Sequence, residues 1–445
     1  MNIKQETTWG GEYVSEKLNI EIKNRDYQIL NIEDVVGLSL RKNPKRAHLL
    51  VSKILGKHIP ASPSLILAAG QILGGMAYEA LGGDMWPMED VFESMDQVMN
   101  GSERSAITMA PPTRKIEAVT IGYAETATSL GYIVAQFLQS PYIHSTRYGK
   151  KGKKAYGAFE EAHSHATSHK LMPSKKSFLH NSLPLVLVDD EMSTGKTIMA
   201  TIEELHALSP RKHYVVCSLI DCRTAKDKAI MDDFATRLGI KLNVVAISHG
   251  EVSYPETILE DVKPVLRDLE QAAEKDAETN LRNPRKPVTI EILKNLPFPD
   301  FKHARYGVKD LTVDEKIAAN LIPVDEDKFL GKVLVLGTEE FMFLPLMAAW
   351  SLEKQGENVF SSSTTRSPVM PHSSTEYAIR TKLTYSLPDG DERYLYNADG
   401  FDIVVIIVEP GNDYRDFFVD NGLIQALETT STSKIIIIQG DTHVR

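Results

Sequence analysis

The sequence predicts an α/β fold in which a Rossmann-like, mostly parallel sheet is followed by a second α/β domain. The first observation is the apolar run Leu185–Val188, which ends in acids and leads into a helical pattern. The second is a similar strand–loop–helix unit at Ala118–Phe137. The third is a new series of strand-like apolar runs beyond residue 285, including Ile403–Val408 and Ile435–Ile438.

Composition narrows the class of protein. With 445 residues, the chain is long enough for at least two domains. A net charge of −10 argues against a general nucleic-acid-binding surface. The two cysteines, Cys217 and Cys222, lack metal-type spacing, so we expect neither disulfides nor a thiolate metal site. The N-terminus has no signal-peptide core, and no apolar run approaches the roughly 18 residues of a membrane span. We therefore expect a cytoplasmic protein without nucleic-acid or membrane partners.

The first 112 residues are expected to contribute a strand at Tyr27–Ile32 and two helices. One helix opens near Asn43 and ends near Gly56, and the other covers residues 64–82. Three basic residues lie close to the first helix: Lys53, Lys57 and His58. They suit either a solvated helix face or a hood over an anionic substrate.

In the second unit, a strand at Val119–Ile121 is followed by the loop Gly122–Thr126 and then by a helix. Small residues in such a loop let the backbone approach phosphates closely. Glu125 is unexpected beside phosphates, unless it reaches Mg²⁺ or caps the helix. The alternative is an ordinary strand-to-helix turn.

The acids that follow the strand Leu185–Val188 are Asp189, Asp190 and Glu191, and a hydroxyl-rich loop comes next. The loop consists of Ser193, Thr194, Gly195, Lys196 and Thr197. Its hydroxyls and helix N-terminal N–H groups suit a monophosphate. Paired acids would repel that phosphate unless a sugar lay between them, its ring hydroxyls on Asp189 and Asp190. A Walker A loop is a competing interpretation, but it needs a glycine at position 190, where aspartate stands; a purely structural turn is another.

Residues 144–172 are polar and lack apolar periodicity, which suggests either a functional loop or a solvated charge run. The basic residues of this stretch, which would neutralise a diphosphate, are Arg147, Lys150, Lys151, Lys153 and Lys154. Acids and histidines follow: Glu160, Glu161, His163, His165 and His169. They suggest acid–base work or phosphate contact on a closed loop. A His-x-His-x-x-x-His zinc site and an inert loop are the alternatives.

The linker Asn283–Pro287 predicts a boundary between a first domain, 1–284, and a second, 285–445. Before it, we expect a helix at 224–239, a strand at 240–247 and a charged helix at Pro264–Glu278. After it, a strand at Val333–Leu336 precedes a helix to Leu352.

These motifs resemble type I phosphoribosyltransferases, in which a strand, two acids, two variable residues and a Thr/Ser-Gly-x-Thr loop bind phosphoribosyl pyrophosphate (PRPP). Lys196 departs from the small residue usual in that loop. Thr365–Pro368 spells TRSP. Together these features make the chain resemble an orotate phosphoribosyltransferase-like protein with a C-terminal TRSP domain, from stress-response gene clusters associated with tellurite resistance. The resemblance implies transfer of ribose 5-phosphate from PRPP to an unidentified base-like acceptor, pyrophosphate release and a nucleoside-like product.

The resemblance also implies roles for particular residues. The residues expected to act in catalysis are Asp189, Asp190, Glu161, His163 and His165. The residues expected to bind the 5′-phosphate are Ser193, Thr194, Gly195, Lys196 and Thr197. The residues expected to bind pyrophosphate are Gly122, Tyr123, Ala124, Glu125, Thr126 and Arg147. Mg²⁺ is expected to arrive with the substrate, with Glu125 or Asp190 as its protein ligand, and a homodimer is expected. A PRPP or nucleotide sensor without turnover is the alternative class, and a P-loop-like ATPase is a third.

The two halves also resemble each other. Gly122 and Gly337 each follow a strand, and Glu125 and Glu340 stand three residues further on. The second half lacks the paired acids and the hydroxyl loop. We therefore hypothesise a diverged copy that retains a strand-end cleft; chance similarity of two α/β domains is the alternative. The residues expected to line that cleft are Thr338, Glu339, Glu340, Thr365, Arg366 and Ser367.

Overall fold

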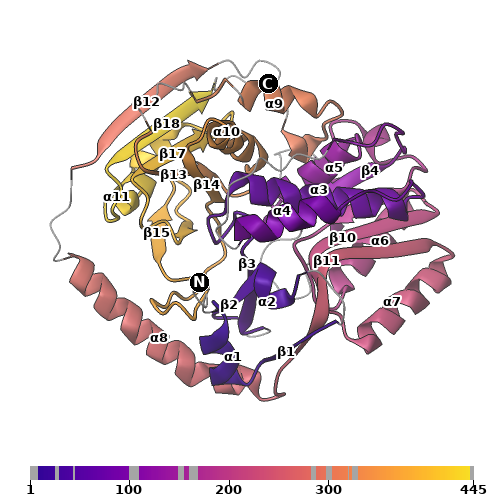
Figure 1. Ribbon diagram of the computed structural model, residues 1–445, viewed down its shortest axis with the longest axis horizontal. Helices are drawn as coiled ribbons and strands as arrows, with labels where there is room; N and C mark the ends of the chain where they lie inside the picture. Colours follow the sequence, from indigo (N-terminus) through magenta and orange to yellow (C-terminus); the bar gives the residue numbers. More distant parts are fainter. Residues whose placement is uncertain are drawn as a thin grey trace, which may run out of the picture.

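A computed structural model describes residues 9–25, 30–43, 46–99, 110–148, 155–159, 169–281, 287–296, 303–318, 320–322 and 329–440. Within these residues, two sheets dominated by parallel pairing lie side by side, one in each half of the chain (Figure 1). We call the described residues up to 281 the first half, and those from 287 the second half. The predicted α/β class is confirmed.

The larger sheet belongs to the first half and runs in the order β1-β11-β10-β8-β4-β5, with β9 paired to β10. Its strands are β1 (Glu21–Asn24), β4 (Val119–Gly122), β5 (Tyr142–His144), β8 (Leu185–Val188), β9 (Glu191–Met192), β10 (His213–Asp221) and β11 (Lys241–Ser253). Among the described strands of this sheet, only β1 pairs antiparallel with its neighbour. All four side chains of β8 are buried, as expected of a central parallel strand covered on both faces.

The helices of the first half connect and cover these strands. They are α1 (Glu12–Leu18), α2 (Ile32–Val35), α3 (Pro63–Ala80), α4 (Glu89–Met99), α5 (Thr128–Phe137), α6 (Lys196–Leu208), α7 (Ala225–Leu238) and α8 (Ile258–Leu281), with the short 3₁₀ helix η1 (Lys176–Phe178). Sequence signals set the ends of α7. Thr224 and Asp227 form a capping box at its start, and Gly239 follows its last turn with φ +62°.

The second half has a five-stranded, fully parallel sheet in the order β12-β18-β17-β13-β14. Its strands are β12 (Thr289–Leu296), β13 (Lys332–Gly337), β14 (Asn358–Ser363), β17 (Ile403–Val408) and β18 (Lys434–Gly440). The accompanying helices are α9 (Thr312–Ala318), α10 (Phe343–Glu353) and α11 (Leu423–Leu427), with the 3₁₀ helices η2 (Ala304–Tyr306) and η3 (Tyr414–Phe418).

Three antiparallel hairpins stand outside the two sheets. They are β2 (Val36–Leu40) with β3 (His48–Ser52), β6 (Gly157–Phe159) with β7 (His169–Leu171), and β15 (Lys382–Ser386) with β16 (Glu392–Tyr396). The first of them packs against the second half: Met370 N–H donates to Leu40 O at 2.8 Å, and the Tyr377 hydroxyl accepts from Leu40 N–H at 2.7 Å.

Apolar packing joins the halves. Val369, Tyr377 and Ile379 of the second half belong to the same buried cluster as β8. A second cluster contains Tyr132 of α5, whose ring stacks on Phe343 of α10 with the ring centroids 3.7 Å apart. The two halves therefore share apolar cores.

Two predicted elements differ in the structure. The helix expected from Asn43 to Gly56 is wrong, because its residues His48–Ser52 form β3 and pair with β2. The strand expected at Tyr27–Ile32 is also wrong where it can be seen, since Ile32 begins α2; residues 26–29 lie outside the described residues. The boundary at residue 285 remains a prediction; the sheets separate between α8 and β12.

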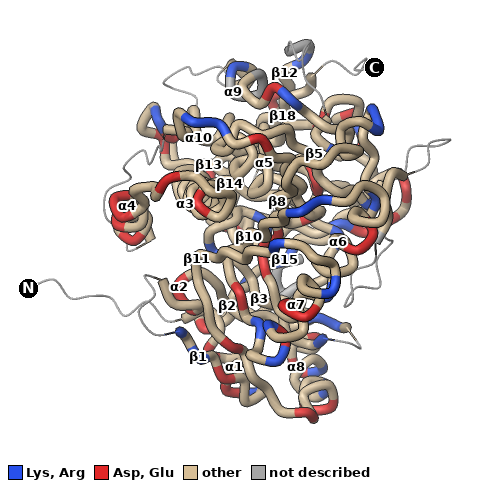
Figure 2. The backbone as a smooth tube through the Cα atoms, turned by 90° about the vertical axis from the view of Figure 1, so that its right-hand side faces the viewer, with Lys and Arg blue, Asp and Glu red and all other residues tan. Residues whose placement is uncertain are grey.

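Acidic residues recur along the outer helices α1, α4 and α8 (Figure 2). This distribution fits the net charge of −10. In the described part of the chain, no helix combines the length and the apolar character needed to cross a lipid bilayer.

Candidate active site

The acid pair stands where β8 ends. Asp189 N–H donates to Cys217 O at 2.9 Å, which holds the backbone against β10. Asp190 N–H donates to the Asp189 carboxylate at 3.0 Å, and the Thr126 hydroxyl donates to Asp190 Oδ1 at 2.8 Å. Burial, followed by the charge of Glu191, raises the pKa of Asp190. The structure thus brings the acid pair and the loop after β4 into direct contact.

The hydroxyl-rich loop wraps the start of α6. Gly195 is its turning point, with φ +74°, and a Cβ there would lie 2.3 Å from Met231 Cε. The left-handed backbone conformation therefore favours glycine at this position, whereas the terminal methyl of Met231 could move aside. Lys196 begins α6 and is exposed. The first N–H groups of an α-helix have no partners within it. Here Lys196 N–H donates to Thr194 Oγ1 at 3.5 Å, and Ser193, Thr194 and Thr197 line the cavity.

The loop after β4 lies beside the acids. Gly122 packs closely, since a Cβ there would lie 2.4 Å from the Tyr142 hydroxyl. Tyr123 N–H donates to Val188 O at 3.0 Å, and Ala124 N–H donates to Ser145 Oγ at 2.9 Å. Two of the loop's N–H groups are therefore used within the protein. The peptide bond between Ala124 and Glu125 is cis.

Glu125 points toward the second half. Its Oε2 accepts from the Thr365 hydroxyl at 2.5 Å and lies 3.3 Å from Lys57 Nζ. Burial alone would raise the pKa of Glu125, but Lys57, Thr365 and Arg366 outweigh burial and lower it. The expectation that Glu125 caps the next helix is wrong, because Ala127 is the N-cap of α5. The carboxylate instead joins the halves.

The polar stretch 144–172 is described only in part. Arg147 reaches the site, and its N–H donates to Glu340 Oε1 at 2.9 Å. His169 also reaches it, with Nδ1 2.9 Å from Ser145 Oγ. The predicted catalytic residues Glu161, His163 and His165 lie outside the described residues, as do Lys150–Lys154 and Glu160.

The expected second-domain cleft is corrected by the structure, because its six residues do not share one cavity. Thr365, Arg366 and Ser367 line the same cavity as Asp189. Glu340 lines a separate cavity of about 30 Å³. Glu339 is buried, with Oε1 2.6 Å from Arg393 Nε, and Thr338 O accepts from Phe341 N–H at 2.8 Å. The cause is the turn after β14, which directs residues 365–368 toward the first half.

Several lining residues were not predicted as site residues. From the β2–β3 hairpin these are Arg41, Lys42, Asn43, Arg46, Leu49 and Leu50. His58, after the hairpin, also lines the cavity; it is one of the three basic residues for which a hood over an anionic substrate was a predicted alternative. Arg46 forms an ion pair with Glu191, the third acid after β8. Burial, then the nearby Lys57, lowers the pKa of His58 to about 3, so its ring is neutral. Two apolar runs around a Lys-Asn-Pro-Lys turn were the available hairpin signal.

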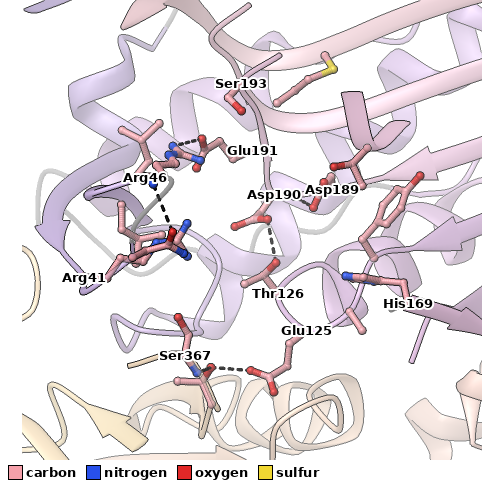
Figure 3. A pocket seen from close by; sticks show the side chains of 18 of the residues that line it. Arg41, Arg46, Glu125, Thr126, His169, Asp189, Asp190, Glu191, Ser193 and Ser367 are labelled. Carbon is pink, nitrogen blue, oxygen red and sulfur yellow. Dashed lines mark hydrogen bonds and ion pairs between the residues drawn. The ribbon is translucent and has the colours of Figure 1, made fainter. Parts of the chain in front are cut away.

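Together these elements enclose a cavity of about 560 Å³. Such a volume is typical of small-molecule sites. Figure 3 shows its arrangement: Ser193 lies at one end, Asp189, Asp190 and Thr126 at the centre, and Glu125 and Ser367 at the other end. Arg41 and Arg46 of the hairpin form a side wall (Figure 3).

Comparison with known families decides what kind of chain this is. Residues 35–251 match a family model described as phosphoribosyl transferase. Residues 302–427 match a model described as the TRSP domain C-terminal to that transferase. The chain belongs to this TRSP-containing phosphoribosyltransferase family. The predicted phosphoribosyltransferase family with a C-terminal TRSP domain is thereby confirmed.

Solved phosphoribosyltransferases show a more distant likeness. An adenine phosphoribosyltransferase from Trypanosoma brucei is 14% identical with a TM-score of 0.23; the match covers 30% of this chain and 57% of that one. The Giardia lamblia enzyme is 16% identical with a TM-score of 0.29, and the match covers 49% of this chain and 97% of that one. An orotate phosphoribosyltransferase from Aeropyrum pernix is 19% identical with a TM-score of 0.17, and the match covers 32% of this chain and 64% of that one. The assignment does not rest on these low scores. No curated protein matches the chain.

Proposed function

We propose that this family member transfers ribose 5-phosphate from PRPP to a base-like acceptor and releases pyrophosphate. One observation carries the proposal: the acid pair, the hydroxyl loop of α6 and the loop after β4 line a single cavity of about 560 Å³. Each of these three features suits a different part of PRPP.

The proposed binding mode follows the order of the elements. The ribose diol would donate to Asp189 and Asp190. The 5′-phosphate would accept from the Ser193–Thr197 loop, where helix N–H groups favour an anion. The pyrophosphate would lie on residues 122–126, with Arg147 lining the same cavity. The backbone N–H groups of Tyr123 and Ala124 already donate to acceptors within the protein. The candidate backbone donors of the loop are therefore those of Glu125 and Thr126.

In the proposed reaction, the bond from the anomeric carbon to a pyrophosphate oxygen breaks, and a bond from that carbon to the acceptor forms. The bonding pair leaves with pyrophosphate, so positive charge develops on the sugar. Asp189 and Asp190 orient the ring and lie close to that charge. The N–H groups and Arg147 stabilise the negative charge on the leaving group. Glu161, His163 and His165 keep the acid–base role predicted from the sequence. We also assign the exclusion of water from the reaction to the stretch 147–172.

Mg²⁺ fits the donor set of the cavity. Carboxylate oxygens are its preferred protein ligands, and it commonly uses one or two of them together with substrate phosphates. Of the two predicted ligands, Asp190 lies at the centre of the cavity, whereas Glu125 is engaged by Thr365 and Lys57. Asp190 is therefore the proposed ligand. The bound ion would supply charge neutralisation of the diphosphate.

Thermal melting tests the proposal. We expect PRPP with Mg²⁺ to stabilise the full chain, by about 2.7 kcal/mol at a concentration 100 times its Kd. The shift should vanish in Asp189→Asn/Asp190→Asn, because the diol loses both negatively charged carboxylate acceptors. The matched control is Asp399→Asn/Asp420→Asn, which changes two exposed acids and should retain the shift. Stabilisation by ATP but not by PRPP would contradict the proposal.

Turnover separates an enzyme from a sensor. With PRPP and a panel of nucleobases, we expect pyrophosphate release that depends on an acceptor and is absent from the Asp189/Asp190 double variant. Tight PRPP binding without pyrophosphate release from any acceptor would favour the sensor.

A further inference from the structure

The two halves repeat the same arrangement of strands. In the first sheet, the neighbours run β10-β8-β4-β5, and in the second they run β18-β17-β13-β14. In each set the first strand in sequence lies between the second and the third. The fifth strand differs in origin, since β11 follows its set in the chain whereas β12 precedes its set. This order supports the hypothesis of a diverged copy.

Hydrogen bonds at the strand ends repeat as well. Ser145 N–H donates to Gly122 O at 2.9 Å, and Thr364 N–H donates to Gly337 O at 3.2 Å. Ser145 Oγ accepts from Ala124 N–H at 2.9 Å, just as Thr364 Oγ1 accepts from Glu339 N–H at 3.1 Å. Equivalent residues therefore occupy equivalent positions.

The contacts between the halves are reciprocal. The Thr365 hydroxyl of the second half donates to Glu125 at 2.5 Å, and the Thr146 hydroxyl of the first half donates to Glu340 at 2.7 Å. Each half also pairs one residue with an edge strand of the other half. Ala61 of the first half forms a β-bridge with Ser361 of β14, and Val308 of the second half forms a β-bridge with Tyr142 of β5. The chain is thus organised like a dimer of two related halves.

The cavity at the strand ends of the second half holds about 30 Å³, against about 560 Å³ for the cavity at those of the first half. Side chains of the second half fill its own cavity: Arg305 forms an ion pair with Glu409 and lies 3.6 Å from Glu340. His303 Nδ1 lies 3.1 Å from Glu409 Oε1. The second half therefore contributes to the cavity of the first.

Arg366 is the cation that the second half brings there. Its guanidinium lies over the Tyr148 ring, 4.5 Å from the centroid, and Nε lies 2.9 Å from Glu339 Oε2. Nε is also 3.8 Å from Glu125 Oε1, beside the loop after β4. Glu339 is itself fixed by Arg393 and the Tyr148 hydroxyl. Among the described residues, the buried Nε and Nη2 atoms of Arg366 have no acceptor in hydrogen-bonding geometry, although Nε forms the ion pair with Glu339.

We propose that Arg366 binds the diphosphate group of PRPP, so that the second half completes the site of the first as a built-in partner subunit. A guanidinium in a fixed orientation suits the paired oxygens of a phosphate. Its position beside Glu125, at the opposite end of the cavity from Ser193, separates it from the proposed 5′-phosphate site (Figure 3). This assignment rests on the proposed function.

Calorimetric titration of the full chain with three probes in Mg²⁺ buffer tests the assignment. The probes are ribose 5-phosphate, inorganic pyrophosphate and PRPP. We expect Arg366→Ala to weaken binding of pyrophosphate and PRPP at least tenfold and to leave ribose 5-phosphate unchanged. Arg366→Lys should recover part of the affinity, because it keeps the charge but loses the paired donors.

The matched control is Arg380→Ala, an exposed arginine of the same half, which should bind all three probes like the parent. An equal loss for ribose 5-phosphate and pyrophosphate in both Arg366 variants would assign Arg366 a purely structural role and overturn the proposal. Unchanged pyrophosphate binding, or none by the parent, would overturn it too. If ribose 5-phosphate fails to bind the parent while pyrophosphate binding depends on Arg366, the proposed function fails instead.

Discussion

At the scale of single residues, Lys57 and Glu125 show why an acid stands beside a proposed phosphate site. Lys57 is 1% exposed, and Nζ donates to Glu339 O at 2.7 Å and Thr364 O at 2.8 Å. Its third near neighbour is Glu125 Oε2 at 3.3 Å. A buried charge is tolerated when its donors meet acceptors in this way. The sequence could not predict this cluster, because the carbonyl acceptors stand 282 and 307 residues further along the chain.

Asp221 gives a prediction about pH at this scale. Arg223 donates to both of its carboxylate oxygens at 2.9 Å, and Arg223 Nη1 lies 3.0 Å from Met231 Sδ, behind the Gly195 turn. Burial alone would raise the pKa of Asp221, but the Arg223 and His249 bonds outweigh it and lower the pKa well below the ordinary 3.8. A lowered folded-state pKa adds stability that is complete above the unfolded value. That stability is lost as pH falls below about 4 toward the folded value.

We expect Asp221→Asn to cost about 3–5 kcal/mol at pH 7, because it leaves a buried guanidinium without its charge partner. Urea denaturation from pH 7 to pH 3 should show the gap between parent and variant narrowing below about pH 4. The exposed Asp399→Asn serves as the control and should follow the parent within about 0.5 kcal/mol. A gap that stays constant with pH would contradict the assignment of the effect to ionised Asp221.

At the scale of elements, local pattern predicted those whose environment is local. The bounds of β8 and β17 agree with the predicted strands, because an unbroken apolar run needs only burial on both faces. Strand β3 was mistaken for part of a helix, because His48–Ser52 shows its strand character only when paired with Val36–Leu40. The placement of residues 365–368 was missed for the same reason, since it depends on contacts with the other half.

The second half should hold the β2–β3 hairpin in place through one side chain. The buried Tyr377 hydroxyl accepts from Leu40 N–H at 2.7 Å and donates to Met370 O at 3.0 Å. We expect Tyr377→Phe to cost about 1–3 kcal/mol in the free energy of unfolding, because it leaves both backbone groups buried without this partner. Chemical denaturation measures the loss. Tyr254→Phe, whose side chain is 48% exposed, should change stability little; an equal effect of both substitutions would refute the claim.

At the scale of the whole molecule, the sequence predicted two α/β domains and their likeness, but not their interdependence. The linker after α8 and the repeated strand-end glycines are local signals. The β-bridges between the halves and the shared core have no local signal in the sequence. Tyr377 and Tyr396, for example, join a cluster built on first-half strands. Because the two halves share a core, we expect this chain to unfold as one cooperative unit, although its length suggests two unfolding units.

This expectation can be measured with tryptophan fluorescence. Trp86 reports on the first half, where its ring packs against Phe137, and Trp350 of α10 reports on the second. The variant Trp9→Phe/Trp350→Phe retains Trp86, and Trp9→Phe/Trp86→Phe retains Trp350. In each variant, we expect the midpoint of the fluorescence unfolding curve to coincide with the calorimetric midpoint of that variant, so that the two curves coincide on this common scale. Coincidence follows because losing either half exposes the apolar cores and leaves Lys57 and Glu125 without partners from the other half. Calorimetry of the parent should give a single peak, with the van't Hoff and calorimetric enthalpies equal. Two peaks, or a reporter that melts apart from its calorimetric transition, would show that the halves are independent and that the second half is an appended module.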